Sequence, residues 1–235
     1  MPVDESVFRQ LAEFDTPTIC NALEMLDPSF RNRSYTTTEV TCLNGPRPRV
    51  GWAYTATMRS LHPSQLEGDQ LKEARLEYYR YMYDDGPEQR KVAVMQDLDG
   101  QDAGRGPFWG EFNTRVHQSA GYQAVVTNGS VRDVEQLPTK ILMLAGAGLR
   151  PSHANVHIVD FGNQVNVCGM VTVHHDLVHA DSHGAVTFPP AMAWDVISKA
   201  AEFVAAEAPV IAAAKSGTLT LETLEALYME RKRAR

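Results

Sequence analysis

Two adjacent residues of opposite charge, Arg132 and Asp133, are the strongest candidates for chemistry in this sequence. They end the segment NGSVRD, which follows the apolar run YQAVVT. A guanidinium presents a planar fork that suits a carboxylate, and an aspartate oxygen is a hard ligand that suits Mg²⁺ or Mn²⁺. An Arg–Asp pair in a turn is also a common surface ion pair, so the dipeptide alone does not define a site.

A predicted helix start lies upstream of this pair. The segment Gly110 to Asn113 opens a helix that is expected to run to about Ala120 and to end at Gly121, a residue type that suits a helix C-terminus. The free backbone N–H groups of a helix start can hold an anion. A 2-oxo acid offers a carboxylate for the helix start and Arg132, and a ketone oxygen for a metal ion. Glu111 would then handle a water or a proton, although a first-turn acid also stabilises a helix by itself.

The remaining elements are expected to place these segments at one edge of a sheet. Ligands of open α/β folds gather at the carboxyl ends of strands, where NGSVRD is expected to lie. Hydrophobic spacing predicts helices over the first 30 residues, with Thr16 as a cap and Pro17 in the first position, and over 67–83, 111–120, 192–215 and 218–233. Strands are predicted at 50–60, 92–100, 122–127, 141–145, 155–161, 164–169, 170–175 and 184–189, with 134–137 continuing helically.

The composition favours one folded unit. The chain has 235 residues, of which 43% are hydrophobic and 22% charged, which is enough to bury a core. No repeat, low-complexity tract or linker divides it. Residues 1–235 are therefore predicted to form a single domain, with N- and C-terminal helices flanking the β layers.

Charge and hydropathy argue against nucleic acid and membrane as partners. The net charge is −7, and the one basic cluster, RKRAR at 231–235, is interpreted as a charged helix end. No apolar stretch approaches the ~20 residues that span a bilayer, and the N-terminus has no secretory signal pattern. Three separated cysteines without a CxxC pair suit a reducing cytoplasm. They are expected to be buried, inert thiols: Cys20, Cys42 and Cys168.

Three stretches together resemble the RraA-like family, which includes the 4-hydroxy-4-methyl-2-oxoglutarate/4-carboxy-4-hydroxy-2-oxoadipate aldolases. The most specific is the order GE(F)–helix–GYxxVVxxGxVRD, which ends at Arg132 and Asp133. DTPTICNALEML resembles the opening helix of the family, and DLVHADSHGAVTFP resembles its late GDLVxADxxGVxxxP signature. The resemblance spans about residues 11–210.

This resemblance implies a fold, an activity and a set of residues. The fold is an α/β/β/α sandwich of the swivelling β/β/α type, and members form trimers or hexamers with active sites between subunits. The aldolases are carbon–carbon lyases that use Mg²⁺ or Mn²⁺ to cleave 2-oxo acids through a pyruvate enolate, and they also decarboxylate oxaloacetate. Asp133 matches the metal-binding aspartate, and Arg132 matches the substrate-binding arginine. The helix start that holds pyruvate is matched by Gly110, Glu111, Phe112 and Asn113, with Glu111 as the acid that orients the catalytic water.

The sequence departs from the family pattern at several positions. The usual Gly-Asp is Gly110-Glu111, whose acid is one methylene longer, and the late Gly-Asp is His175-Asp176. The insert around residues 62–90 is larger than in the short aldolases. The family also uses a C-terminal acid from the neighbouring subunit; Glu202 and Glu207 are both candidates, with Glu207 taken into the catalytic set. The natural substrate and the balance of aldolase and decarboxylase activity stay open.

Histidines form the densest group of alternative metal ligands. The group is His174, His175, His179 and His183. Three of them could share one strand face and bind zinc, but turn signals at Asp176 and at 181–184 would break that register and favour polar loop or interface histidines. His153 and His157 lie four apart in a strand-like stretch, so the helical zinc pattern does not apply to them.

Two other functions compete with a 2-oxo-acid lyase. A non-catalytic regulator that binds an RNA-degrading enzyme would suit an acidic surface. Such a regulator does not need the Gly-Glu helix start, Arg132 and Asp133 together, so their presence favours an enzyme. Methyl transfer to a quinone is disfavoured, because no glycine-rich nucleotide loop follows the first strand.

Overall fold

Four parallel strands form the centre of the fold. The computed structural model describes residues 3–45, 47–86 and 88–233. The parallel strands are β2 (Arg49–Arg59), β3 (Lys91–Asp97), β4 (Tyr122–Thr127) and β5 (Leu142–Ala145), and β1 (Thr41–Asn44) pairs with β5 in the antiparallel sense. Valine-rich runs such as those of β3 and β4 suit strands that are buried on both faces.

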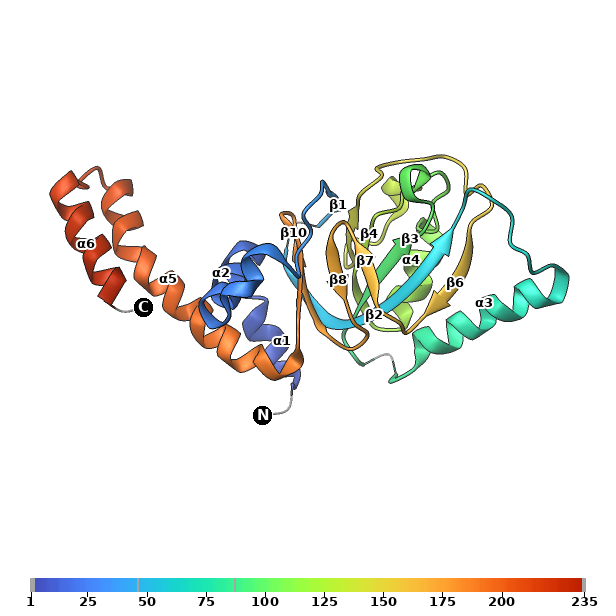
Figure 1. The fold of residues 1–235 in the computed structure, drawn as a ribbon, viewed down its shortest axis with the longest axis horizontal. Coiled ribbons are helices and arrows are strands. Elements are labelled where there is room, and N and C mark those ends of the chain that lie inside the picture. Colours follow the sequence, from blue (N-terminus) through green and yellow to red (C-terminus); the bar gives the residue numbers. More distant parts are fainter. Residues whose placement is uncertain (1–2, 46, 87, 234–235) are drawn as a thin grey trace.

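The long strand β2 links two parts of a curled sheet (Figure 1). Its first half pairs with β9 (Leu177–Asp181), which forms a hairpin with β10 (Gly184–Phe188), and its second half pairs with β6 (His157–Phe161). A separate ribbon joins β7 (Val165–Val167) and β8 (Met170–Thr172). The β9–β10 hairpin and the β7–β8 ribbon build a second β layer beside the parallel strands, whereas β6 packs on the side of α3.

The fold has four layers, two of helices outside and two of strands inside, and a hydrophobic cluster lies between each neighbouring pair. One packs the parallel strands against helices α3 (Gly68–Tyr83) and α4 (Glu111–Ser119), through residues such as Tyr78 and Tyr122. A second joins the parallel strands to the β7–β10 layer, with Val94 and Val126 facing Val167. The third packs that layer against three helices, namely α1 (Glu5–Leu11), α2 (Thr16–Leu26) and α5 (Ala193–Lys215). The predicted α/β/β/α arrangement is confirmed.

Two local predictions need correction. The cap of α2 is Asp15, whose side chain accepts the N–H of Thr18 at 2.9 Å. Thr16 is instead the first helical residue, and its N–H donates to the buried Asp181 at 2.7 Å. Residues 134–137 do not continue as an α-helix, because only a single 3₁₀ turn forms at Val134–Gln136.

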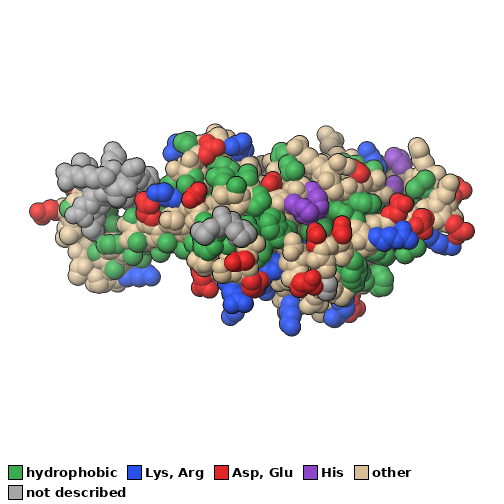
Figure 2. Space-filling model, turned by 90° about the horizontal axis from the view of Figure 1, so that it is seen from below, with side chains coloured by type: hydrophobic (Ala, Val, Ile, Leu, Met, Phe, Trp, Pro, Cys, Tyr) green, Lys and Arg blue, Asp and Glu red, His purple; other side chains and the backbone are tan. Residues whose placement is uncertain are grey.

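A helical arm projects from the body of the molecule. The outer half of α5 and α6 (Leu221–Arg233) form a hairpin at the end opposite α4 (Figure 1). Hydrophobic side chains lie along this arm (Figure 2), and its exposed members are Val204, Ile211, Leu221 and Tyr228. The predicted basic tail falls at the end of α6, where the side chains of 231–233 and all of Arg235 lie outside the described residues. None of the helices in the described ranges has the length and apolar character needed to cross a membrane.

Candidate functional site

Three loops meet at the carboxyl ends of β3, β4 and β5. The N–H of Arg132 donates to the carbonyl of Trp109 at 3.0 Å, and the N–H of Val131 donates to the carbonyl of Gly148 at 2.9 Å. One-residue parallel bridges therefore hold the loop after β4 between the other two loops. This is the edge where open α/β sheets place ligands, and it confirms the predicted location of NGSVRD.

A buried carboxylate fixes the loop that leads from β3 to α4. Asp97, at the end of β3, accepts the N–H of Gly104 at 2.7 Å and that of Asp99 at 3.0 Å. Burial raises the pKa of the Asp97 carboxyl group. The hydroxyl of Ser130 donates to the carbonyl of Gly104 at 2.7 Å and so ties this loop to the one after β4. Side-chain to backbone hydrogen bonds therefore anchor both loops.

Arg132 and Asp133 face the first turn of α4. Oδ2 of Asp133 lies 3.3 Å from the N–H of Glu111 and 3.4 Å from Nε of Arg132. Asp133 has φ 56° and ψ 41°, a left-handed conformation that aspartate tolerates better than most residues. The two side chains are each about two-fifths exposed, at 38% and 40%, so both can reach a ligand.

Gly110 leaves room for this arrangement. A Cβ atom at that position would lie 2.6 Å from Oδ2 of Asp133 and 2.9 Å from Cγ of Arg132. Its φ of −166° is an extended conformation that any residue adopts, so the requirement is for space. The glycine before α4 therefore has a steric role at the site, which its position in the sequence does not reveal.

A pocket of about 270 Å³ opens beside these groups. Its lining includes Gly110, Phe112, Asn113, Arg132 and Asp133, together with Arg75, Pro107, Phe108, His153 and Val156. A second hollow, of about 430 Å³, also has Arg132 and Asp133 in its lining, together with Leu149 and Arg150. The predicted helix start and the Arg-Asp pair thus come together on one cavity.

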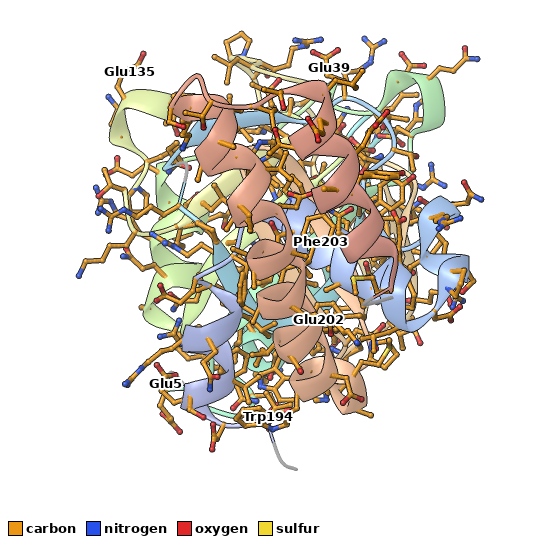
Figure 3. All side chains as sticks on the ribbon, turned by 90° about the vertical axis from the view of Figure 1, so that its left-hand side faces the viewer. Glu5, Glu39, Glu135, Trp194, Glu202 and Phe203 are labelled. Atoms are coloured by element: carbon orange, nitrogen blue, oxygen red, sulfur yellow. The ribbon has the colours of Figure 1, made fainter. Side chains whose placement is uncertain are left out.

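The side chains of the predicted catalytic acids Glu111 and Glu207 do not line the pocket in this chain. The side chain of Glu111 pairs with Nε of Arg115 at 2.8 Å along the surface of α4, and only its backbone N–H approaches Asp133. Glu207 belongs to the outer half of α5, and this part of the helix lies at the opposite end of the molecule from α4 (Figure 1). Glu202, the other candidate, pairs with Lys199 at 2.6 Å and lies on α5 beside Phe203 (Figure 3). Within one chain, the described lining of the pocket contains no residue of α5.

The histidine group is spread over three places. His174 and His175 stack in the turn before β9, with ring centroids 3.8 Å apart. His179 is fully buried in β9, where its Nε2 donates to the carbonyl groups of Leu11 and Phe14. His183 lies in the β9–β10 turn and contacts Asp181. The turns break the strand register as predicted, and burial makes His179 a core residue.

The donor set fits magnesium better than zinc. Among the described residues, no group of three or more His, Cys, Asp or Glu side chains is arranged to hold a metal ion. Zinc usually needs three or four protein ligands. Mg²⁺ is commonly held by one or two carboxylates, with water and substrate oxygens completing its shell. Asp133, partly exposed on the pocket, is the residue that could supply such a carboxylate.

Of the three cysteines predicted to be buried, one is buried and two are partly buried. All three are free thiols, with Cys168 as the buried one. Burial raises the pKa of each thiol, to about 12 for Cys20. The thiolate form is therefore disfavoured, and none of the three has the setting of a nucleophile.

Comparisons with known proteins identify the family. Residues 16–187 match the RraA-like family (Aldolase/RraA), and the chain belongs to it. An uncharacterized protein from Pseudomonas syringae pv. tomato str. DC3000 has a similar structure, with a TM-score of 0.75, 20% identity, and coverage of 98% of this chain and 96% of that one. A search of curated proteins gave no match.

Two further structures carry the RraA name. Streptomyces coelicolor RraAS2, described as an unusual member of the RNase ES inhibitor RraA protein family, has a TM-score of 0.68, 22% identity, and coverage of 88% and 96%. The RNA-processing inhibitor RraA from Thermus thermophilis has a TM-score of 0.51, 18% identity, and coverage of 72% and 92%. At these identities the likeness establishes the shared fold.

Proposed function

We propose that this protein is a divalent-metal-dependent carbon–carbon lyase that cleaves a 4-hydroxy-2-oxo acid or oxaloacetate and releases pyruvate. One observation carries the proposal: Arg132, Asp133 and the first turn of α4 converge on a single pocket. A cation, an acid and a set of backbone donors are the groups that a 2-oxo carboxylate and its metal ion require.

Different groups of the pocket bind the substrate carboxylate and the metal ion. Arg132 donates a two-pronged hydrogen bond to the substrate carboxylate, and the amides of Glu111, Phe112 and Asn113 donate at the start of α4. Asp133 would hold Mg²⁺ or Mn²⁺, which, when bound, stabilises negative charge on the ketone oxygen. Phe112, which is 66% exposed, adds an aromatic ring to the lining of the pocket.

A proton must leave the 4-hydroxyl group when the carbon–carbon bond of a hydroxy acid breaks. We assign its acceptance to a water held by Glu111. In this role the Glu111 carboxylate moves away from Arg115. Breaking this half-exposed ion pair costs little free energy. Glu207 from the arm of a neighbouring subunit completes the set.

The arm supports assembly into a trimer or hexamer. Its exposed hydrophobic side chains lie beyond the part of α5 that packs on the body, and burying such a surface favours association. Closed symmetry would bring each arm to an equivalent position on a neighbour.

The proposal is tested by assaying purified protein for pyruvate release from a panel of 4-hydroxy-2-oxo acids and oxaloacetate, with Mg²⁺ or Mn²⁺. Activity should vanish with EDTA and return with the metal. Release that persists after exhaustive chelation would refute the metal-dependent mechanism, and no release from any substrate would refute the lyase.

A regulator that binds an RNA-degrading enzyme is the second candidate. It is favoured by similarity to two structures described as RNase or RNA-processing inhibitors and by the acidic net charge of −7. In that case, charge-preserving changes at Arg132 would be tolerated. Inhibition of an RNase by the purified protein, without pyruvate release, would favour this function over the lyase.

A further inference from the structure

Arg75, on α3, brings a second guanidinium to the pocket that contains Arg132. Its Nε donates to the hydroxyl of Tyr79 at 2.9 Å, and one Nη donates to Oδ1 of Asn113 at 3.1 Å. The amide nitrogen of Asn113 donates to the carbonyl of Phe108 at 2.6 Å, which fixes the amide with its oxygen toward Arg75. The guanidinium is thus held in one orientation.

The partners of Arg75 are neutral. Among the described residues, no carboxylate lies within ion-pair distance of its guanidinium. The two hydrogen bonds above use two of the five N–H groups that a guanidinium has. Partly buried arginines usually pair with an anion, because removing an unpaired charge from water is unfavourable. The ring centroids of Tyr79 and Phe108 each lie 5.5 Å from the guanidinium carbon, so the cation is oriented by neutral groups alone and its remaining N–H groups can bind an anion from outside the protein.

The position of Arg75 is fixed by the packing of α3 on α4. The hydroxyl of Tyr78 donates to Nε2 of the buried His117 at 2.8 Å, and Nδ1 of His117 donates to the carbonyl of Asn113 at 2.6 Å. The hydroxyl groups of Tyr83 and Ser119 lie 2.6 Å apart further along the two helices. Because its position is fixed, the Arg75 guanidinium can distinguish ligands by where their charged group lies as well as by its charge.

We propose that Arg75 is a specificity-determining residue, which binds a second carboxylate at the end of the substrate remote from the 2-oxo group. This inference rests on the proposed function, since it assumes that Arg132 holds the first carboxylate. The pocket wall carries two arginines and one aspartate. With a divalent cation on Asp133, a dianionic substrate balances these charges better than a monoanionic one.

A neutral tail is the competing occupant of this end of the pocket. A mainly apolar hollow of about 230 Å³ lies beyond Arg75 and shares Arg75 and Val156 with the pocket. Its other lining residues are Leu71, Lys72, Ala74, His157 and Ile158. To enter it, an apolar chain must pass the guanidinium and cover its N–H groups without replacing their hydrogen bonds to water, which is unfavourable. A carboxylate that stops at Arg75 meets no such cost.

The test compares two ligands of equal length that differ at this end. 2-Oxoglutarate ends in a carboxylate, and 2-oxopentanoate ends in a methyl group. Their Kd values are measured by calorimetry in Mg²⁺ for wild type, Arg75→Gln, Arg75→Lys and the control Arg80→Gln. Arg80 lies on the same helix and pairs with Glu73 outside the pocket, so its variant makes the same charge change.

Wild type and Arg80→Gln should bind 2-oxoglutarate at least about tenfold more tightly than 2-oxopentanoate, the scale of one charged hydrogen-bonded pair. Arg75→Gln should lose this preference while keeping its affinity for 2-oxopentanoate, which also shows that the variant is folded. Arg75→Lys should retain part of the preference, since the charge stays and the fork is lost.

Three results would overturn the inference. A preference for 2-oxoglutarate that survives Arg75→Gln would remove the role of Arg75. Equal binding of both ligands by wild type, or tighter binding of 2-oxopentanoate, would mean that the Arg75 end of the pocket accepts a neutral group. The proposed 2-oxo-acid site at Arg132 would not be affected by that result. If wild type bound neither ligand, the proposed function would fail together with the inference.

Discussion

The backbone N–H of Glu111 lies 3.3 Å from Oδ2 of Asp133, so the first turn of α4 and the loop after β4 share one carboxylate. A substrate carboxylate that binds at this helix start would meet the negative charge of Asp133. Two anions at one helix N-terminus repel each other unless a cation lies between them. If Asp133 binds the proposed metal ion, anion binding at this helix start should therefore be coupled to metal binding.

This coupling predicts opposite effects of Asp133→Asn with and without metal. In Mg²⁺, the variant should bind pyruvate more weakly than wild type, because it loses the metal. In EDTA, it should bind pyruvate at least as tightly as wild type, because the repulsion is gone. Calorimetric titration of both proteins under both conditions measures this. Weaker binding by Asp133→Asn in EDTA as well would mean that the acid helps to hold the anion without a metal.

Gly110→Ala should damage the site more than the fold. The added methyl group would lie 2.6 Å from Oδ2 of Asp133 and would displace it. We expect kcat/KM for pyruvate release to fall about 100-fold, the scale of an ångström-level misplacement at a reacting centre. The free energy of unfolding should fall by about 1–3 kcal/mol, as for an overpacked buried position. Normal activity in a folded variant would show that the close contact is dispensable.

The parts of the site that depend on residues close together in the chain were predictable from the sequence. The helix at 111–119, the strand before NGSVRD and the Arg-Asp pair follow from residue type and spacing, because each depends on near neighbours in the chain. The helix at 68–83 was also predictable, and a signal for Arg75 was present: it shares a helical face with Tyr78, Tyr79 and the buried Met82.

What that face packs against was not predictable. Asn113, which orients Arg75, lies on a different helix, and such a contact is set by the packing of layers rather than by a pattern within one segment. The clearance at Gly110 likewise depends on the left-handed conformation of Asp133. The sequence suggested a proton-handling role for Glu111 without revealing that its side chain pairs with Arg115.

Two buried histidines should make the fold sensitive to acid. Burial lowers the pKa of His117 to about 3 and that of His179 to about 4, from an ordinary value of 6.5. Below pH 6.5 the unfolded chain binds protons that the folded chain does not, so the free energy of unfolding should fall as pH falls. Each residue should contribute a loss of about 2 kcal/mol by pH 5, at about 1.4 kcal/mol per pH unit.

Denaturant unfolding at pH 7 and pH 5 tests this origin of acid sensitivity. His117→Gln should lower the free energy of unfolding at pH 7, because hydrogen bonds in the core are lost, and should flatten its dependence on pH. His62→Gln, at an exposed position, is the control and should behave as wild type. An unchanged pH slope in His117→Gln would assign the sensitivity to other groups.

Sharing of sites between subunits predicts complementation. Light scattering should give three or six times the mass of one chain. Asp133→Asn and Glu207→Gln should each be inactive alone, and mixed oligomers prepared by joint refolding should regain activity, because some sites receive an intact pair of residues. Replacing Glu207→Gln by Glu202→Gln in this experiment shows which of the two acids is needed for activity. A fully active monomer would contradict both the assembly and the shared site.

The role of Arg132 in a lyase is tested by kcat/KM of Arg132→Lys for pyruvate release from oxaloacetate. The assay contains Mn²⁺ and is corrected for release in a protein-free blank. If Arg132 holds the substrate carboxylate by a two-pronged hydrogen bond, lysine keeps the charge and loses the fork. The variant should lose about 2–4 kcal/mol of transition-state stabilisation, with little change in Tm, because the ion pair of Arg132 with Asp133 is partly exposed. Arg105→Lys, at an exposed arginine outside the pocket, should match wild type. Near-normal turnover in Arg132→Lys would contradict the account, and so would a large fall in its Tm, which would mark Arg132 as a structural residue.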